Sequence, residues 1–342
     1  MQAIPVTVHV PHFVGEGKID IVEQRVPEPG AGQLLIRVKA NALCASERPQ
    51  LTKGSFVTPG HEAAGVVVVA GPGTRSAVGT RGVIYLMDFC GGCRSCRAGD
   101  TNQCLRKRGD MGFTKDGGYG IYALVHETIF FPVGTDLSPA EATLLLDVMG
   151  TTSHAIRRAQ LVRPDIASLL VMGAGPVGLG VVALATLLLG ADVPVLVADV
   201  VPYRLALAER LGGRPIHLGE TDLATVVRDG GSGAVDVAID TSGKAVARRA
   251  ALDVMAKRGA LVCVGHGEDL ALMVSPDLIA PERAVLGSEY FRYDELAGNL
   301  GLLRAHRAYL AQIITHRYGI DELQHAFEVF FGRETGKVVI EQ

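Results

Sequence analysis

The sequence predicts an α/β fold with a doubly wound parallel sheet and a second domain beside it. The chain has 342 residues, 48% of them hydrophobic, which is enough for about two domains with buried cores. Residues 166–191 (IASLLVMGAGPVGLGVVALATLLLGA) form an uncharged stretch that contains five glycines and one proline. Further apolar runs follow at 193–199, 235–243 and 259–267, and each ends in an acidic residue or a glycine.

The uncharged stretch is long enough to cross a bilayer, so a membrane helix is one interpretation of it. Its glycines and Pro176 instead favour a buried strand, a glycine turn and a buried helix, which is how a parallel sheet is built. The three apolar runs that follow are predicted to be further strands of this sheet.

The turn after the first predicted strand has the spacing GxGxxG. Gly173 permits a tight turn, Gly175 allows a pyrophosphate to approach, and Gly178 lets the helix pack closely. Pro176 and Val177 lie in the same loop and are predicted to contact the dinucleotide.

The second predicted strand ends in Asp199. A carboxylate at this position accepts hydrogen bonds from the ribose hydroxyls and repels a 2′-phosphate, which favours NAD over NADP. Arg204 lies five residues further on and keeps NADP open as an alternative.

Four of the six cysteines lie between residues 90 and 104 with the spacing C-x2-C-x2-C-x7-C, at Cys90, Cys93, Cys96 and Cys104. The cytoplasm keeps thiols reduced, so a metal site is a better interpretation than disulfides. Sulfurs at this spacing can converge on one tetrahedral zinc ion at about 2.3 Å. Because the protein would fill all four positions, this zinc is predicted to be structural.

Two alternatives exist for the cysteine cluster. Bacterial ferredoxin motifs close with three residues and a proline, whereas here seven residues intervene and Leu105 follows, which disfavours an iron–sulfur cluster. A zinc knuckle beside the basic run 106–108 could bind nucleic acid, but this run is short and the net charge is −3. We expect these basic residues, with Arg94 and Arg97, to offset the negative charge of the thiolates.

The N-terminal segment MQAIPVTVHVPHF lacks the basic and long apolar parts of a secretion signal, which predicts a cytoplasmic protein. With 33 basic and 36 acidic side chains, no overall field favours nucleic acid or anionic membranes. Small neutral or polar molecules are therefore the expected ligands.

Two short motifs precede the cysteine cluster: CASE from Cys44 and PGHEAAG from Pro59. Alone, they are equally consistent with a buried thiol and a core imidazole. Followed by the four-cysteine cluster and the glycine loop, they resemble the zinc-containing medium-chain alcohol dehydrogenases. The resemblance covers nearly the whole chain, because GRETGKVVI at 332–340 is similar to the closing strand of that family.

The resemblance implies a second, catalytic zinc held by Cys44, His61 and Asp147. Asp147 is matched through LLLDVMGTTSHA, where the family places a ligand four residues before a threonine, here Thr151. Three protein ligands leave one position open for water or substrate. Glu62 would lie beside the metal as a neighbour or a transient ligand. For Asp147, an exposed acid near a helix start is the alternative.

The resemblance also implies a GroES-like, β-rich catalytic domain of residues 1–146 and 287–342, with the structural zinc lobe at 90–104. Residues 147–286 would form a Rossmann NAD-binding domain, and the substrate would bind in the cleft between the two. Family members are usually homodimers or homotetramers. The residues implied on the nicotinamide side are Thr241, Val264, Gly265 and His266.

The implied reaction passes a hydride from the substrate carbon to NAD, while zinc acts as a Lewis acid on the substrate oxygen. Ser46 matches the hydroxyl that takes the substrate proton, although a serine here could instead bond the backbone. Thr151 would contact the nicotinamide, although a threonine that starts a helix is also an ordinary cap.

The sequence departs from the family pattern at two positions after Cys44. Pro49 replaces a histidine that relays the proton to solvent in many relatives, so that relay is absent. Glu47 replaces the more common aspartate, and we expect it to form an ion pair with a basic residue of the tail such as Lys337.

A carboxylate as third ligand favours a polyol, sugar, cyclitol or other secondary alcohol as substrate, with a primary alcohol as the alternative. Two other kinds of protein stay open: a non-catalytic dinucleotide-binding protein of the same fold, and a zinc-free enone or quinone reductase. The presence of Cys44, His61, Asp147 and Ser46 favours an NAD-dependent zinc enzyme with two zinc ions per chain.

Overall fold

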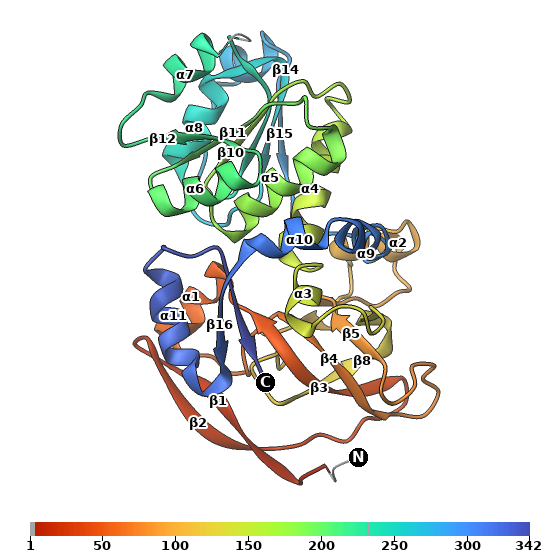
Figure 1. The fold of residues 1–342 in the computed structure, drawn as a ribbon. Coiled ribbons are helices and arrows are strands. Elements are labelled where there is room, and N and C mark those ends of the chain that lie inside the picture. Colours follow the sequence, from red (N-terminus) through yellow and green to blue (C-terminus); the bar gives the residue numbers. More distant parts are fainter. Residues whose placement is uncertain (1–3, 231–232) are drawn as a thin grey trace.

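The computed structural model describes residues 4–230 and 233–342. Two large sheets form two parts of the molecule, and the C-terminal end of the chain lies in the lower, β-rich part (Figure 1). The six-stranded parallel sheet of the upper part has the strand order β12 (Arg214–His217), β11 (Val195–Asp199), β10 (Leu169–Met172), β13 (Val235–Asp240), β14 (Met255–Cys263) and β15 (Ala284–Gly287).

The second large sheet has seven strands. Its strand order is β16 (Ile314–Gly319), β17 (Lys337–Glu341), β3 (Gln33–Ala42), β4 (Glu62–Ala70), β5 (Arg81–Ile84) and β9 (Phe130–Pro132), with β8 (Tyr122–His126) also paired to β3. Two strand pairs complete the β structure: β1 (Thr7–Gly15) with β2 (Lys18–Arg25), and β6 (Met87–Asp88) with β7 (Gly109–Asp110).

The α-helices flank these sheets (Figure 1). They are α1 (Arg48–Lys53), α2 (Arg94–Arg97), α3 (Pro139–Thr143), α4 (Thr152–Gln160), α5 (Pro176–Leu189), α6 (Pro202–Arg210), α7 (Leu223–Asp229), α8 (Ala245–Asp253), α9 (Glu295–Ala305), α10 (Arg307–Leu310) and α11 (Leu323–Phe331). Two short helical turns matter for the site: the 3-10 turn η1 (Ala45–Glu47) and the π-helical turn η4 (Asp147–Thr151).

The predicted α/β fold class is confirmed. The predicted runs at 193–199, 235–243 and 259–267 contribute β11, β13 and β14, and the closing strand is β17. The uncharged stretch forms β10, the glycine turn and α5, which has 14 residues. Within residues 4–230 and 233–342, no helix has both the length and the apolar character that crossing a membrane requires.

The carboxyl ends of the central parallel strands lie side by side. Met172 of β10 pairs with Ala198 of β11 and with Asp240 of β13, and Asp240 pairs in turn with Cys263 of β14. The segments that follow these strands therefore share one edge of the sheet, which is where α/β sheets bind their ligands.

Helix α5 links this edge to the η4 turn. A Cβ atom at Gly180 would overlap the carbonyl oxygen of Val148, so glycine lets α5 lie directly against the η4 turn. Because η4 begins at Asp147, the helix that follows the glycine loop also supports this carboxylate.

Candidate active site

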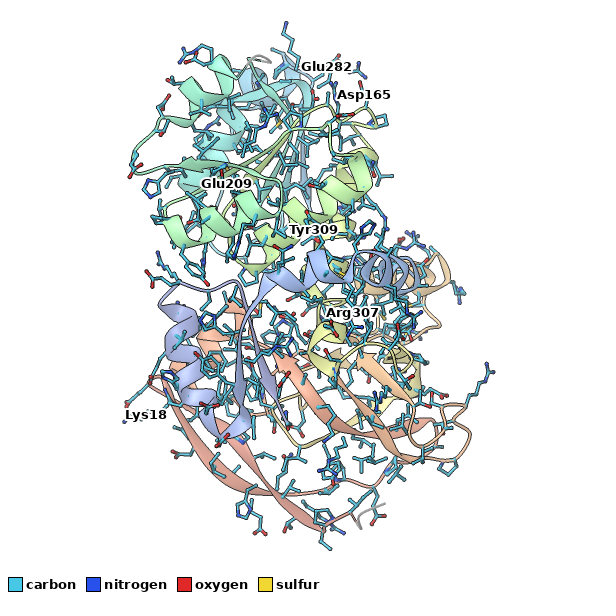
Figure 2. The ribbon with its side chains drawn as sticks, in the orientation of Figure 1. Lys18, Asp165, Glu209, Glu282, Arg307 and Tyr309 are labelled. Carbon is cyan, nitrogen blue, oxygen red and sulfur yellow. The ribbon has the colours of Figure 1, made fainter. Side chains whose placement is uncertain are left out.

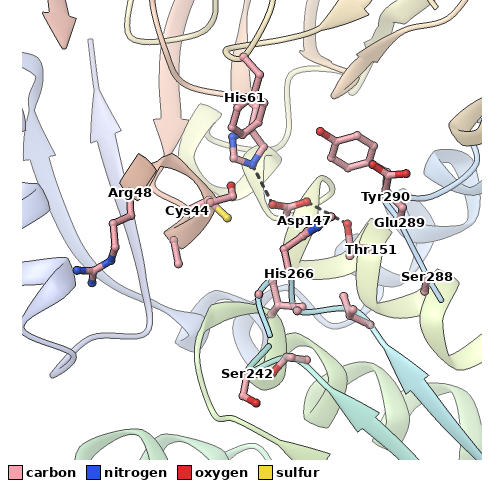
Figure 3. Close-up of a pocket in the computed structure, with 18 of the residues that line it drawn as sticks. Cys44, Arg48, His61, Asp147, Thr151, Ser242, His266, Ser288, Glu289 and Tyr290 are labelled. Carbon is pink, nitrogen blue, oxygen red and sulfur yellow. Dashed lines mark hydrogen bonds and ion pairs between the residues drawn. The ribbon is translucent and has the colours of Figure 1, made fainter. Parts of the chain in front are cut away.

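Four potential metal ligands from separate segments converge at one point. Cys44 precedes η1, His61 and Glu62 lie at the start of β4, and Asp147 begins η4. One ligand atom of each side chain lies within 4.8 Å of those of the others. Figure 3 shows Cys44, His61 and Asp147 facing one another. The structure thus brings together the three predicted ligands and the predicted neighbour Glu62.

Hydrogen bonds fix the His61 ring. Its Nε2 atom lies 3.1 Å from Oδ2 of Asp147, and its Nδ1 atom lies 3.2 Å from Oε1 of Glu47. Glu47 is fully buried and also accepts hydrogen bonds from the Tyr119 hydroxyl (2.8 Å) and the Cys44 backbone N–H (3.3 Å). Glu47 therefore holds the imidazole from behind and leaves Nε2 directed at the cluster.

The expectation that Glu47 forms an ion pair with Lys337 is wrong. Lys337 instead forms a buried ion pair with Glu62. The strand order explains this choice: β3 lies between β4 and β17, and Ala42 of β3 pairs with Glu62 on one side and with Val339 on the other. Lys337 and Glu62 thus lie near the same end of β3.

The electrostatics of the cluster favour a positive charge. Burial lowers the pKa of His61, but hydrogen bonds to Asp147, Cys44 and Glu47 outweigh burial and raise it well above its ordinary value. Burial alone would raise the pKa of Asp147, yet the contact with His61 holds it below its usual range. The Lys337 ammonium also interacts electrostatically with Glu62, Cys44 and Asp147.

This donor set fits a zinc ion. Thiolate, imidazole and carboxylate are the ligands that zinc takes in proteins, and three of them leave an open position. The Oε2 atom of Glu62 is buried and has no hydrogen-bond partner in residues 4–230 and 233–342. An unsatisfied buried carboxylate oxygen beside the cluster is consistent with a cation at this position.

The four-cysteine cluster has the geometry of a second zinc site. The Sγ atoms of Cys90, Cys93, Cys96 and Cys104 lie within 4.8 Å of one another. Cys93 Sγ is 3.4 Å from that of Cys96 and 3.9 Å from that of Cys104, close to the ~3.8 Å edge of a tetrahedron with zinc–sulfur bonds of about 2.3 Å. A hydrogen bond from the Cys96 backbone N–H contributes most to lowering the pKa of Cys93 to about 6.

The expectation that all nearby basic residues offset the thiolates is partly wrong. Arg108 pairs with Asp88, and Lys107 pairs with Asp110. Backbone N–H groups face the sulfurs instead: the Cys90 N–H donates to Cys104 Sγ and the Cys96 N–H donates to Cys93 Sγ.

Each of the three glycines in the loop is favoured at its position for a different steric reason. Gly173 has a φ of +97°, and a Cβ atom at Gly178 would overlap the Gly173 carbonyl oxygen. At Gly175, a Cβ atom would meet only Nη1 of Arg204, at 3.8 Å. Gly175 therefore leaves open space where a dinucleotide phosphate can approach the N-terminus of α5.

Asp199 and Arg204 both lie beside this loop. Asp199 Oδ2 accepts a hydrogen bond from the Ala174 N–H (2.6 Å), while Oδ1 accepts from the N–H groups of Val200 and Val201. Arg204 Nε donates to the carbonyl of Thr335 (3.2 Å), so the closing segment of the chain anchors it. Burial lowers the pKa of Arg204, and the charge of Asp199 counteracts this.

One cavity of about 630 Å³ joins the ligand cluster to the edge of the parallel sheet. Its volume is in the range of small-molecule sites. The predicted site residues that line it are Cys44, Ser46, His61, Asp147, Thr151, Val177, Thr241, Val264, Gly265 and His266. The predicted residues outside its lining are Glu62, Gly173, Gly175, Pro176, Gly178, Asp199 and Arg204.

The two threonines predicted to contact the cofactor also make internal hydrogen bonds. Thr151 Oγ1 donates to Asp147 Oδ1 (3.0 Å), which orients that carboxylate. Thr241 Oγ1 donates to the Gly173 carbonyl (2.9 Å), which ties the end of β13 to the glycine loop.

Several cavity residues are absent from the sequence-based site. Arg48 stacks over the Phe331 ring at 3.9 Å, and Phe113 lies against His61 with ring centroids 5.0 Å apart. Glu289 and Tyr290 line the cavity directly after β15. No strand was predicted at 284–287 from the sequence, so no sequence signal identified Glu289 and Tyr290 as site residues.

Comparisons with known proteins identify the family. Residues 30–135 match the model of the alcohol dehydrogenase GroES-like domain, and residues 176–304 match that of the zinc-binding dehydrogenase. The L-threonine 3-dehydrogenase of Rhizobium johnstonii is 32% identical over 332 residues, which cover 92% of this chain and 93% of that protein. The chain belongs to the zinc-containing medium-chain alcohol dehydrogenase family.

Solved structures of other dehydrogenases have the same fold. An alcohol dehydrogenase from Escherichia coli CFT073 in complex with NADH has a TM-score of 0.87 and 21% identity, covering 99% of this chain and 100% of that one. A zinc-binding dehydrogenase from Sinorhizobium meliloti 1021 bound to NADP has a TM-score of 0.83 and 26% identity, covering 98% and 99%.

Family membership confirms the class of reaction. The dehydrogenase is a zinc-dependent oxidoreductase that acts on CH–OH donors, with a nicotinamide dinucleotide as the hydride carrier of the family.

Proposed function

We propose that this dehydrogenase oxidises a polyol, sugar, cyclitol or other secondary alcohol with NAD at a zinc ion held by Cys44, His61 and Asp147. The observation that supports the proposal is their convergence on a cavity that also includes Thr241 and His266 from the edge of the parallel sheet. A metal ligand set and a dinucleotide edge around one cavity are what alcohol oxidation requires.

The chain supplies the groups around the reacting carbon. Bound zinc would supply a Lewis acid for the substrate oxygen. Ser46 is exposed, lines the cavity and makes no hydrogen bond to another described residue, so its hydroxyl is free to accept the substrate proton. Pro49 lines the same cavity and cannot relay that proton, which leaves water and the cofactor ribose as the exit.

Glu62 has a supporting role in this proposal. It is fully buried, pairs with Lys337 and lies outside the cavity lining. Burial raises the pKa of Glu62 to about 8, and the charge of Lys337 opposes that rise. Glu62 would therefore support the ion from behind the cavity lining, with its unpartnered Oε2 available as a further oxygen donor.

The four-cysteine cluster would hold the second zinc and brace the lobe at 90–104. Its ligand set is complete without water or substrate, which supports a structural role. The proposal therefore requires two zinc ions per chain.

For the cofactor, Asp199 supports NAD and Arg204 keeps NADP possible as a second candidate. Because Asp199 also binds the backbone of the glycine loop, Asp199→Gly should lower NAD binding as well as relax selectivity. We expect the NADP-to-NAD ratio of kcat/KM to rise by about tenfold or more, equivalent to about 1.4 kcal/mol. In Arg204→Ala the ratio should fall, and an unchanged ratio in both variants would refute the assignment.

The substrate class is tested by following NADH absorbance with the zinc-loaded enzyme. The panel holds polyols, sugars, cyclitols, secondary alcohols and primary alcohols, with L-threonine included because of the Rhizobium relative. The proposal predicts the highest kcat/KM with a polyhydroxy or secondary alcohol. Ser46→Ala should lower kcat while leaving the dissociation constant of NADH unchanged. A primary alcohol as the best substrate would reject the proposed class.

We also propose the domain limits 1–146 with 287–342 and 147–286, a cytoplasmic location, and a homodimer or homotetramer. Size-exclusion chromatography with light scattering tests the oligomeric state. A monomeric mass would contradict the proposed dimer or tetramer.

A further inference from the structure

Residues 288–290 form a short segment of the cavity wall, directly after β15. Figure 3 shows Ser288, Glu289 and Tyr290 on the opposite side of Asp147 from Cys44. The backbone is anchored at both ends: the Ser288 N–H donates to the Cys263 carbonyl (3.0 Å), and the Asn102 side chain donates to the Glu289 carbonyl (2.9 Å). These two hydrogen bonds therefore hold the segment in a fixed position in the cavity wall.

The backbone conformation of this segment is unusual. Tyr290 has a φ of +48°, in the left-handed region that bulky side chains rarely adopt. Strained residues of this kind cluster at ligand sites, where the surrounding structure enforces them. The strained residue, Tyr290, follows the cavity-lining residues Ser288 and Glu289 and precedes Phe291, whose side chain is fully buried in the core.

The polar side chains of the segment make no hydrogen bond with described residues. Ser288 is 8% exposed, and its buried Oγ has no hydrogen-bond partner in the described residues. The Glu289 carboxylate is exposed and forms neither an ion pair nor a hydrogen bond with described residues, whereas Asp110, another acid that lines the cavity, pairs with Lys107. Burial raises the pKa of Tyr290, and the charge of His61 opposes that rise.

Cationic and anionic groups occupy different parts of the cavity lining. The cation Arg48 stacks on Phe331 of the C-terminal part of the chain. Three acids line the cavity: the proposed zinc ligand Asp147, Asp110, which pairs with Lys107, and Glu289, which pairs with no described residue. A substrate carboxylate near Glu289 would meet a like charge, while a hydroxyl or ammonium group would meet an acceptor.

Building on the proposed function, we propose that Glu289 and Tyr290 form a substrate-specificity subsite. It binds hydrogen-bond donors on the part of the substrate next to the reacting carbinol and disfavours acidic substrates. The subsite therefore selects polyhydroxy or amino alcohols over hydroxy acids.

Three probes with the same secondary carbinol test this proposal: 1,2-propanediol, 1-amino-2-propanol and lactate. Each is measured as a substrate with NAD, or as a competitive inhibitor where turnover is slow. In the wild type we expect lactate to be the weakest of the three. Glu289→Lys should raise the lactate-to-propanediol ratio of kcat/KM, or of 1/Ki, by about tenfold or more. Glu289→Gln should raise it less.

Glu209→Gln is the matched control, because Glu209 is an exposed acid on α6 (Figure 2) that does not line the cavity. This control variant should leave the lactate-to-propanediol ratio unchanged.

Tyr290→Phe should raise KM for 1,2-propanediol and leave the dissociation constant of NADH unaltered, which a damaged fold would not do. Equal ratios in the wild type and both Glu289 variants would overturn the subsite. No activity of the zinc-loaded wild type with any alcohol would instead refute the proposed function.

Discussion

The Nε2 atom of His61 lies 3.1 Å from Oδ2 of Asp147, although 86 positions separate the two residues in the sequence. His61 is placed by the start of β4, and Asp147 by a π-helical turn against which α5 packs. π turns occur often at functional sites. Here the turn also brings Thr151 to within 3.0 Å of Asp147, so its hydroxyl can orient the carboxylate.

Glu47 should control how firmly the proposed zinc ion at Cys44, His61 and Asp147 is held. Its carboxylate holds Nδ1 of His61 and the backbone N–H of Cys44, and removal of such outer partners of ligands usually costs about 10- to 100-fold in metal affinity or activity. In Glu47→Ala the zinc affinity should fall by about 10- to 100-fold, measured by competition with a fluorescent zinc indicator. Tyr119→Phe, which removes only one donor to Glu47, should have the smaller effect.

The glycine loop allows a matched pair of substitutions. Gly178→Ala should destabilise the protein by about 1–3 kcal/mol, because the new Cβ would overlap the Gly173 carbonyl oxygen. Gly175→Ala has room within the protein and should leave the free energy of unfolding nearly unchanged while weakening NADH binding. Urea unfolding and NADH fluorescence titration measure the two effects. Equal stability losses in both variants would contradict the separate roles of the glycines.

The ion pair between Glu141 and Arg307 should make stability depend on pH. Glu141 also caps α3 through Ser138, and the hydrogen bonds from Arg307 are the main cause that lowers its pKa from 4.5 to about 2. A lowered folded-state pKa stabilises the protein above the unfolded-state value, and this contribution is lost as pH falls toward the folded-state value. Since Arg307 is half-exposed, the pair contributes only about 1 kcal/mol.

Glu141→Gln should therefore be less stable than the wild type at pH 7 by about this amount. The difference should stay constant down to about pH 5 and shrink between pH 4.5 and about 2, measured by urea unfolding. A difference that grows as the pH falls would contradict the sign of the shift.

The features that could be predicted from the sequence are those that depend on short-range residue patterns. The four-cysteine spacing and the GxGxxG loop are local, so the structure of each follows from a few neighbouring residues. Asp147 was matched only through family resemblance, because a π turn has no simple sequence pattern.

The errors concern tertiary contacts. The partner of Lys337 depends on the order of β4, β3 and β17 in the sheet, which the residues of any single strand do not determine. The positive φ of Tyr290 and the unpaired state of Glu289 likewise depend on how Asn102 and β14 anchor the segment after β15. Neither residue has a motif of its own.

The central claim is that a second, catalytic zinc ion binds at Cys44, His61 and Asp147. The most direct test is the zinc content per chain, by mass spectrometry of the purified protein, for the wild type and the Cys44→Ala/His61→Ala double variant. The account predicts two ions in the wild type and one in the double variant, with the cysteine cluster still loaded. One ion in both proteins, or two in both, would contradict it.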